Sequence, residues 1–306
     1  MQIAFQCQKV YFLITITDKK SINSKKRVFF IIFAKNRSLM TDKEIILQAW
    51  ENRELLKDRQ TQNAINDTIA LLNRGEIRVC EKRDNDWQVN QWIQKAIVLY
   101  FPISKTKKIV AGDLEFADKI PTKKDYLEWG VRAVPSAVAR YGAFIAQGVI
   151  LMPSYVNIGA YVDSGTMIDT WATVGSCAQI GKNVHLAGGV GIGGVLEPIG
   201  AKPVIIEDDC FIGSRCIVVE GARICEGAVL GAGTTVTAST RIIDVSSTEK
   251  KEYRGLVPPN SVVIPGSITK KFPAGEYNVN CALIIGKRKE STDKKTSLNQ
   301  ALRQLD

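Results

Sequence analysis

The stretch that decides the fold runs from Phe144 to Ile192 and reads FIAQGVILMPSYVNIGAYVDSGTMIDTWATVGSCAQIGKNVHLAGGVGI. Counting in steps of six from its first residue, every position is apolar. These anchors are Phe144, Ile150, Val156, Val162, Ile168, Val174, Ile180, Leu186 and Ile192. A second frame continues the period with Ile206, Ile212, Val218, Ile224, Leu230, Val236 and Ile242. Two unbroken frames of this kind are an internal repeat, which indicates a solenoid.

A six-residue period fits neither the 3.6 of a helix nor the 2 of a strand. It fits a coil of flat strands and tight corners, with one anchor per face pointing inward. The position four residues after most anchors is small or β-branched, as a narrow interior requires: Ser154, Ala160, Thr166, Ala172, Ala178, Val184, Val190, Cys210, Cys216, Ala222, Ala228, Thr234 and Thr240. Three faces make an 18-residue coil. This predicts the stacked columns Ile150–Ile168–Leu186 and Ile206–Ile224–Ile242.

Glycines recur where the coil has to turn. We expect a positive φ at the corner glycines Gly159, Gly165, Gly175, Gly181, Gly213 and Gly231. Coils stacked about 4.8 Å apart and paired by parallel ladders form a parallel β-helix. The two frames are out of phase between Ile192 and Ile206, so a loop over 193–205 must leave the coil. Loops of this kind often carry function.

The flanking segments have other periods. Upstream, amphipathic helices are expected over 42–59 and 62–73, a strand over 77–81 and a helix over 91–100. Downstream, residues 246–253 break the repeat and Val262 and Ile268 resume it, before a strand over 281–285 and a helix over 297–305. The predicted fold class is mainly β. Its parts are a helical N-terminal domain over 40–130, a β-helix over 131–270 and a small C-terminal strand and helix segment over 271–306.

Charge is unevenly distributed along the 306 residues. Residues 1–39 carry eight of the 41 Lys and Arg but only one of the 31 acids. The net charge of +10 therefore comes mostly from that segment, and the repeat shows no footprint for nucleic acid. The 39 residues are expected to be a disordered or non-native extension, because a capping-box pattern follows Met40 at Thr41 and Glu44. A secretory signal is the alternative, and Lys19 and Lys20 stand where small cleavage-site residues are expected.

Other features narrow the class of protein. No apolar run reaches the length of a membrane-spanning helix, so we expect no membrane association. Seven cysteines without a C-x-x-C pair indicate a reducing cytoplasm. Cys210 and Cys216 are expected to be inert small hydrophobic residues. The only histidine, His185, cannot supply the three zinc ligands of a β-helical carbonic anhydrase.

Four polar or aromatic residues on the coil are candidates for chemistry. Asp169 follows the anchor Ile168 and is a candidate general base, and Trp171 beside it is expected to shield it from water. A corner carboxylate that only caps a turn is the alternative. Arg132 is a candidate for binding a substrate carboxylate, or for an ordinary surface ion pair. His185 is predicted to point outward, as an alternative base or as a solvated side chain.

Long strings in the repeat carry a family resemblance. Five strings closely resemble the sequences of tetrahydrodipicolinate N-succinyltransferases. They are LMPSYVNIGAYVD from Leu151, GTMIDTW from Gly165, ATVGSCAQIGKNVH from Ala172, GGVGIGGVLEP from Gly188 and IEDDCFIG from Ile206. The resemblance covers most of residues 41–306. It implies a left-handed β-helix, a homotrimer with active sites between subunits, and a cytoplasmic enzyme of lysine and diaminopimelate biosynthesis.

The resemblance also implies an activity. By this resemblance, we expect a succinyl group to pass from succinyl-CoA to the amine of tetrahydrodipicolinate in its hydrated or ring-opened form, and Arg132 and Asp169, which match family residues, to bind that substrate. We expect small-molecule substrates, no metal and no tightly bound cofactor. Backbone N–H groups of residues 188–194 are candidates for holding the oxyanion.

One position departs from the family. Many members carry a catalytic Glu where this chain has Ile217, and Glu220 is the nearest carboxylate. Glu220 is therefore the candidate second catalytic residue, with a corner role as the alternative. An acetyl-CoA-dependent transferase on the same or a similar amine stays open as a function. A structural β-helix is disfavoured because its Thr or Ser ladders are missing from the irregular outward positions Asn157, Asp163, Asp169 and Glu207.

Overall fold

The computed structural model describes residues 41–84, 86–249 and 251–289. The chain divides into two compact units, residues 1–45 and 46–306, and the β-helix belongs to the second. The expected N-terminal extension and the expected helix over 297–305 lie outside the described residues. Within the part of the chain that is described, no helix is long and apolar enough to cross a membrane.

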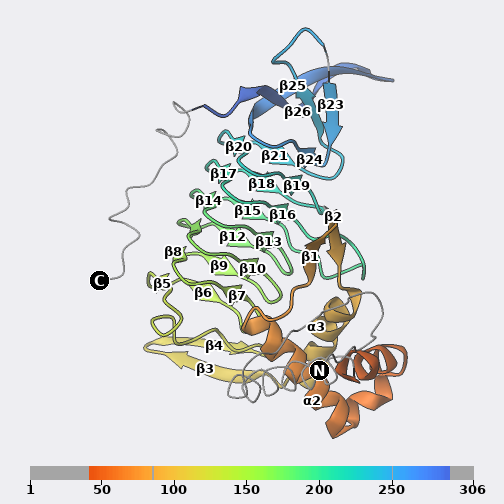
Figure 1. The fold of residues 1–306 in the computed structure, drawn as a ribbon, viewed down its shortest axis with the longest axis vertical. Helices are drawn as coiled ribbons and strands as arrows, with labels where there is room; N and C mark the ends of the chain where they lie inside the picture. Colours follow the sequence, from red (N-terminus) through yellow and green to blue (C-terminus); the bar gives the residue numbers. More distant parts are fainter. Residues whose placement is uncertain (1–40, 85, 250, 290–306) are drawn as a thin grey trace, which may run out of the picture. The chain divides into compact units, whose positions relative to one another are not determined.

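A three-faced parallel coil forms the middle of the chain, and Figure 1 shows its short strands as stacks. The first stack, here the β5 face, contains β5 (Arg132–Ala133), β8 (Ile150–Leu151), β11 (Met167–Ile168), β14 (His185–Leu186), β17 (Phe211–Ile212) and β20 (Val229–Leu230). The β6 face contains β6 (Val138–Ala139), β9 (Tyr155–Val156), β12 (Thr173–Val174), β15 (Gly191–Ile192), β18 (Ile217–Val218) and β21 (Thr235–Val236). The β7 face contains β7 (Phe144–Ile145), β10 (Tyr161–Val162), β13 (Gln179–Ile180), β16 (Ile205–Ile206), β19 (Arg223–Ile224) and β24 (Leu256–Val257).

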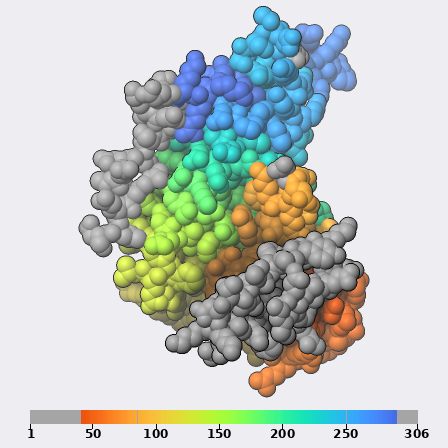
Figure 2. Space-filling view, viewed as in Figure 1, coloured from red at the N-terminus to blue at the C-terminus, as the bar shows by residue number. Residues whose placement is uncertain are grey.

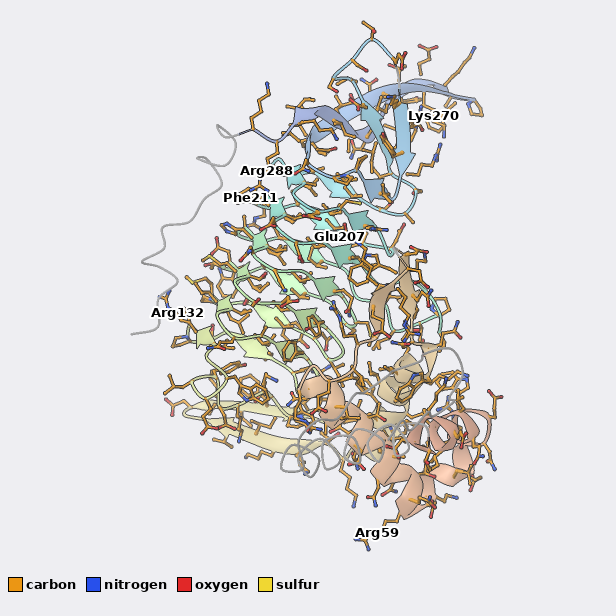
Figure 3. The ribbon with its side chains drawn as sticks, in the orientation of Figure 1. Arg59, Arg132, Glu207, Phe211, Lys270 and Arg288 are labelled. Carbon is orange, nitrogen blue, oxygen red and sulfur yellow. The ribbon has the colours of Figure 1, made fainter. Side chains whose placement is uncertain are left out.

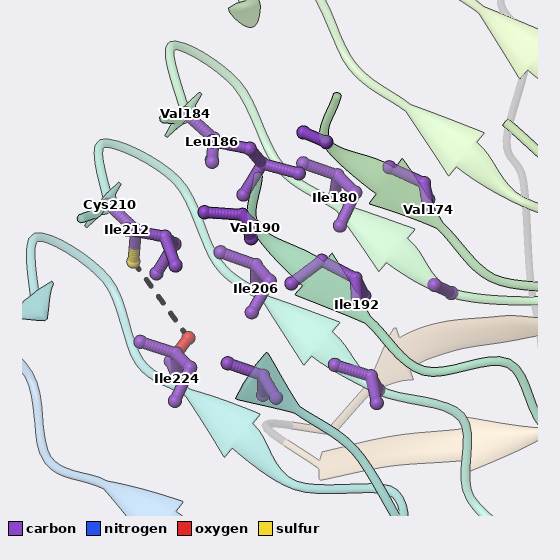
Figure 4. Packing of buried hydrophobic residues seen from close by; sticks show 14 of the residues in the cluster. Val174, Ile180, Val184, Leu186, Val190, Ile192, Ile206, Cys210, Ile212 and Ile224 are labelled. Atoms are coloured by element: carbon purple, nitrogen blue, oxygen red, sulfur yellow. Dashed lines mark hydrogen bonds between the residues drawn. The ribbon is translucent and has the colours of Figure 1, made fainter. Parts of the chain in front are cut away.

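The second residue of each of these short strands faces the interior of the coil. Ile168, Leu186 and Ile212 stack in register on the β5 face and are fully buried. Figure 4 shows how the columns of the three faces meet in one apolar core. Truncating an aliphatic side chain in such a core to Ala costs about 2–5 kcal/mol. The parallel β-helix predicted from the six-residue period is confirmed.

The first frame begins one residue later than predicted. Phe144 pairs with Tyr161 and Ile150 pairs with Met167, so both predicted anchors are outward residues. Ile145 and Leu151 point inward instead. The slip occurs because the corner over residues 152–154 has three residues, whereas the corners after it have four. The first column therefore consists of Leu151, Ile168 and Leu186, with Leu151 in place of the predicted Ile150.

The second predicted column is also wrong at its end. Ile224 pairs with Val257, not with Ile242. Ile242 lies in β22 (Arg241–Asp244), which leaves the coil to pair with β23 (Lys251–Arg254) and β26 (Gly275–Lys287). The repeat therefore skips residues 241–255 and resumes at β24.

In the four-residue corners of the coil, positive φ values fall on the third residue, and Glu220 at the second position of its corner is a further case. Gly165 fits the prediction, with φ 70°, but Gly213 does not. Arg215, two residues on, has φ 60° instead. At Gly213 the reason for glycine is a close approach, because a Cβ there would lie 2.6 Å from the Leu230 carbonyl oxygen. Gly175, Gly181 and Gly231 also lack the predicted positive φ, and at each of them a Cβ would approach neighbouring atoms closely.

The predicted helix over 42–59 is interrupted. Residues 41–51 are helical, a 3-10 helix η1 covers Arg53–Lys57, and α2 covers Arg59–Asn73. Asn52 accepts a hydrogen bond from the Glu54 N–H (3.1 Å), and Asp58 accepts one from the Thr61 N–H (3.1 Å). Two capping side chains inside one apolar pattern therefore divide it.

The rest of the N-terminal region packs against the coil. Helix α3 (Gln91–Ile103) runs past the predicted end, through Pro102. The strand expected over 77–81 is β1 (Cys80–Arg83), which pairs with β2 (Asp86–Val89), and β3 (Lys107–Ala111) pairs with β4 (Leu114–Asp118). The hairpin β1–β2, orange in Figure 2, lies against the coil, where the Trp87 indole N–H donates to Glu207 (2.9 Å).

The loop leaving the coil spans residues 193–204, close to its predicted bounds. The side chain of Gln94 on α3 holds it at two points. Its Oε1 accepts from the Gly200 N–H (2.9 Å), and its Nε2 donates to the Ala201 carbonyl (3.1 Å). The loop is therefore tied to the helical region.

Beyond the coil, β25 (Ser261–Phe272) and β26 form one long antiparallel hairpin. Val263 still points into the coil and is buried. Ile268 was predicted to continue the repeat, but it pairs with Val279 within the hairpin. The strand expected over 281–285 lies inside β26.

Candidate active site

Asp169 is the first corner residue after β11. Its Oδ1 accepts hydrogen bonds from the Thr170 backbone N–H (2.6 Å) and hydroxyl (3.3 Å). The backbone N–H of Asp169 donates to the Leu186 carbonyl on the next coil (2.9 Å). The corner thus fixes one carboxylate oxygen and leaves the other to face outward. With its side chain 29% exposed, the carboxylate is accessible to a small substrate.

His185 lies beside this carboxylate. It occupies the outward position of β14, directly in register with Met167 of β11. Its Nε2 is 3.8 Å from Asp169 Oδ2, and its side chain is only 12% exposed. The ring meets Phe211 of β17 edge-on, with centroids 5.0 Å apart. Two candidates from the sequence are therefore neighbours, and His185 points outward as predicted.

Trp171 follows Asp169 by two residues at the same corner. It is 71% exposed, with φ 61° at the third corner position. Its side chain projects over a shallow apolar groove whose lining includes Pro153 and Tyr155. Because the indole is itself largely exposed in this chain, its expected shielding of Asp169 stays a prediction.

Arg132 lies on the β5 face, but not next to Asp169. It is the outward residue of β5 and pairs with Ile150, which in turn pairs with Met167. Two strand spacings, about 10 Å, separate the β5 and β11 backbones. Figure 3 shows Arg132 and Phe211 along the same edge of the coil. The arginine side chain can cover part of that distance, so a carboxylate bound to Arg132 would belong to a molecule that reaches from there toward the Asp169 corner.

Ile217 and Glu220 belong to a different part of the coil. Ile217 is the outward residue of β18 on the β6 face and is 45% exposed. Glu220 is exposed at the following corner, with φ 57°. Asp169 lies at the corner between the β5 and β6 faces, whereas Glu220 lies between the β6 and β7 faces. One chain therefore does not bring the two carboxylates together.

The glycine-rich stretch does not present the expected row of N–H groups. Those of Gly189, Gly191 and Gly193 donate to the carbonyls of Thr170, Cys216 and Val218 at 2.8–2.9 Å. The ladder between coils uses them, so they are not directed at a substrate. That expectation is wrong for these three residues.

The cysteines on the coil are buried thiols. Burial raises the pKa of Cys177, Cys210 and Cys216, which disfavours the reactive thiolate. Cys210 and Cys216 sit at the small inward position of the repeat, as predicted. Their environment is that of packing residues.

Comparison with known proteins adds the family. The model for the N-terminal region of tetrahydrodipicolinate N-succinyltransferase matches residues 42–103, and the model for the hexapeptide repeat of succinyl-transferase matches 203–238. The chain is 52% identical over 270 residues to 2,3,4,5-tetrahydropyridine-2,6-dicarboxylate N-succinyltransferase of Cupriavidus necator, covering 85% of this chain and 97% of the relative. The enzyme of the same name from Psychrobacter sp. is 50% identical over 275 residues, covering 86% and 99%. The chain belongs to this N-succinyltransferase family.

Membership of this family explains the coil, and the structure adds one residue to the candidate site. The chain is a left-handed β-helix with the hexapeptide repeat of its family. Arg215, which the sequence analysis did not single out, lies at the same corner of the coil as Asp169. Trp171 and Gly189 are 18 residues apart, but Gly189 and Arg215 are 26 apart because the loop intervenes. The 18-residue spacing is interrupted by the loop, so the sequence alone does not align Arg215 with Trp171.

Proposed function

We propose that this chain transfers a succinyl group from succinyl-CoA to the amine of tetrahydrodipicolinate in its hydrated or ring-opened form. One water opens the ring and supplies the 6-oxo oxygen, and the products are N-succinyl-2-amino-6-oxopimelate and CoA. The reaction belongs to lysine and diaminopimelate biosynthesis. The observation that carries the proposal is the accessible Asp169 carboxylate beside His185 on the hexapeptide coil of this family. Free, buried thiols among the described cysteines support a reducing, cytoplasmic setting.

The chemistry assigns a role to Asp169. The amine nitrogen attacks the thioester carbonyl, an amide C–N bond forms, and the C–S bond breaks. The attacking nitrogen loses a proton, which the outward Oδ2 of Asp169 accepts, while the departing thiolate takes up a proton to give CoA. Oδ1 is held by Thr170, so the carboxylate keeps its orientation through the step.

Arg132 is proposed to bind a carboxylate of the acceptor. A guanidinium holds a carboxylate bidentately, and the β5 face places it on the same side of the coil as His185. Its distance from Asp169 suits an acceptor that carries carboxylates at both ends. No tightly bound cofactor takes part in this scheme, and succinyl-CoA is a cosubstrate.

A homotrimer would complete the site. Glu220 is proposed as the second carboxylate, contributed by a neighbouring subunit to the corner that holds Asp169. The support is geometric, because the two residues occupy different corners of one coil. Sedimentation of the purified protein should give the mass of three 33.7 kDa chains. A fully active monomer would overturn the shared site.

The donor is tested by competition. The enzyme is given tetrahydrodipicolinate with equal concentrations of succinyl-CoA and acetyl-CoA, and the two products are separated by mass. We expect the succinyl product to exceed the acetyl product by at least tenfold. A preference for acetyl-CoA would assign the chain to acetyl transfer and leave the fold unchanged.

A further inference from the structure

Three residues stack at the corner that carries Asp169. Trp171, Gly189 and Arg215 each occupy the third corner position and have positive φ. The Gly189 N–H donates to the Thr170 carbonyl (2.8 Å), and the Arg215 N–H donates to the Gly188 carbonyl (3.0 Å). The column thus rises directly from the coil that holds the base.

The Arg215 side chain lies flat across Gly189. A Cβ at Gly189 would come within 2.8 Å of Arg215 Cδ and Nε and 3.2 Å of Cζ. Only a glycine leaves this space open. The side chain therefore runs back along the corner, toward the coil that bears Asp169 and Trp171. The backbones of Arg215 and Asp169 are about 10 Å apart, and the side chain covers part of that distance.

The guanidinium is open to a ligand. Arg215 is exposed, and no acid among residues 41–84, 86–249 and 251–289 forms an ion pair with it. Trp171, which is 71% exposed, precedes Gly189 by one coil in the same column. An exposed guanidinium and an exposed indole are thus carried by the same corner column as the proposed base. A planar fork of N–H donors in this setting suits a carboxylate.

We propose that Arg215 binds a substrate carboxylate beside Asp169. This inference rests on the proposed function, because both substrates of that reaction carry carboxylates. The carboxylate is either the distal group of the succinyl thioester or a carboxylate of the acceptor. Arg215 is in either case a determinant of substrate specificity, distinct from Arg132 on the β5 face.

The test uses Arg215→Asn, since Asn tolerates a positive φ, and Arg215→Lys, which keeps the charge and loses the fork. Donors are succinyl-CoA and butyryl-CoA, which has the same chain length without the carboxylate. If Arg215 holds the succinyl group, kcat/KM for succinyl-CoA falls about 10–100-fold in Arg215→Asn, with little change for butyryl-CoA. If it holds the acceptor, the acceptor KM rises by a similar factor with both donors. Arg215→Lys should lie between Arg215→Asn and the unchanged enzyme.

The control is Arg254→Gln, which removes an exposed arginine on β23. It should leave all these constants within twofold. Donor and acceptor constants within twofold in both folded Arg215 variants would overturn the inference. The unchanged enzyme's preference for succinyl-CoA would still stand as the separate test of the proposed function.

Discussion

At the scale of single residues, the account depends on the Asp169 carboxylate. Asp169→Asn keeps the shape and the Thr170 hydrogen bonds to Oδ1 but removes the proton acceptor. We expect kcat to fall by about 10²–10⁴, the range for loss of a general base. Steady-state rates at saturating acceptor measure it. If most of the activity remains, the base is another group, and His185 at 3.8 Å is the next candidate.

Arg132 should affect binding more than turnover. Carboxylate binding is largely shared by the ground and transition states, so Arg132→Ala is expected to raise the acceptor KM about 10–100-fold with a small change in kcat. Acceptor titrations at saturating succinyl-CoA measure both constants. A fall in kcat with an unchanged KM would contradict this role.

The sequence identified Asp169, Arg132 and His185 individually but not their arrangement. The predicted stacking of Ile168 on Leu186 would have placed Asp169 near His185, because Asp169 follows Ile168 and His185 precedes Leu186. The positive φ of Trp171 was not predicted, because the sequence pattern does not reveal a positive φ at a non-glycine residue.

At the scale of elements, Lys123 joins a helix to the coil. It is 4% exposed, and its Nζ donates to the Asn73 carbonyl (3.0 Å), the Asn73 Oδ1 (2.9 Å) and the Ala143 carbonyl (3.1 Å). Asn73 ends α2, and Ala143 precedes β7. Lys123→Met leaves these acceptors without their donor, so we expect a loss of about 2 kcal/mol of unfolding free energy. Thermal melting should show it, and Lys119→Met, which removes an exposed bond to Phe101, should change Tm little.

The same lysine predicts a pH dependence. Burial lowers the pKa of Lys123 to about 8 from 10.5. The unfolded state then binds more protons between these values, so this group makes the fold more stable as pH rises from 8 to 10.5 and less stable as pH falls through 8. The Tm difference between the unchanged protein and Lys123→Met should therefore be larger at pH 9.5 than at pH 7. An equal difference at both pH values would contradict the lowered pKa.

The strands of the coil were predictable from the sequence, whereas the hairpins were not. A buried column repeated every six residues leaves a clear apolar pattern, as at Ile180, Leu186 and Ile192. The repeat does resume at β25, where Val262 pairs with Val229 of the coil, but the inward residue is Val263. The prediction fails at Ile268, which pairs with Val279 across the hairpin β25–β26. Long-range pairing of this kind has no local signature.

At the scale of the whole molecule, the shared site can be tested by mixing subunits. Glu220→Gln is expected to lower kcat about 10²-fold, and Asp169→Asn by at least as much. If each site takes Asp169 from one subunit and Glu220 from another, trimers reassembled from equal amounts of the two variants regain about a quarter of full activity. Activity equal to the average of the two variants would contradict a shared site. A silent Glu220→Gln would make Glu220 a corner residue only.

Assembly was accessible to sequence reasoning only through the resemblance. The repeat predicts a coil, but outward residues such as Ile217 and Trp171 do not by themselves define a partner. The separation of Asp169 and Glu220 on two corners became visible only once the register of the faces was known.

The central claim is succinyl transfer to the amine of tetrahydrodipicolinate. The most direct measurement incubates the purified full chain with tetrahydrodipicolinate and succinyl-CoA, quantifies free CoA thiol and identifies the product by mass spectrometry. The account predicts one N-succinyl-2-amino-6-oxopimelate per CoA released, at a rate that depends on Asp169. Thiol release without an N-succinyl product, or no release above the enzyme-free rate, would contradict it.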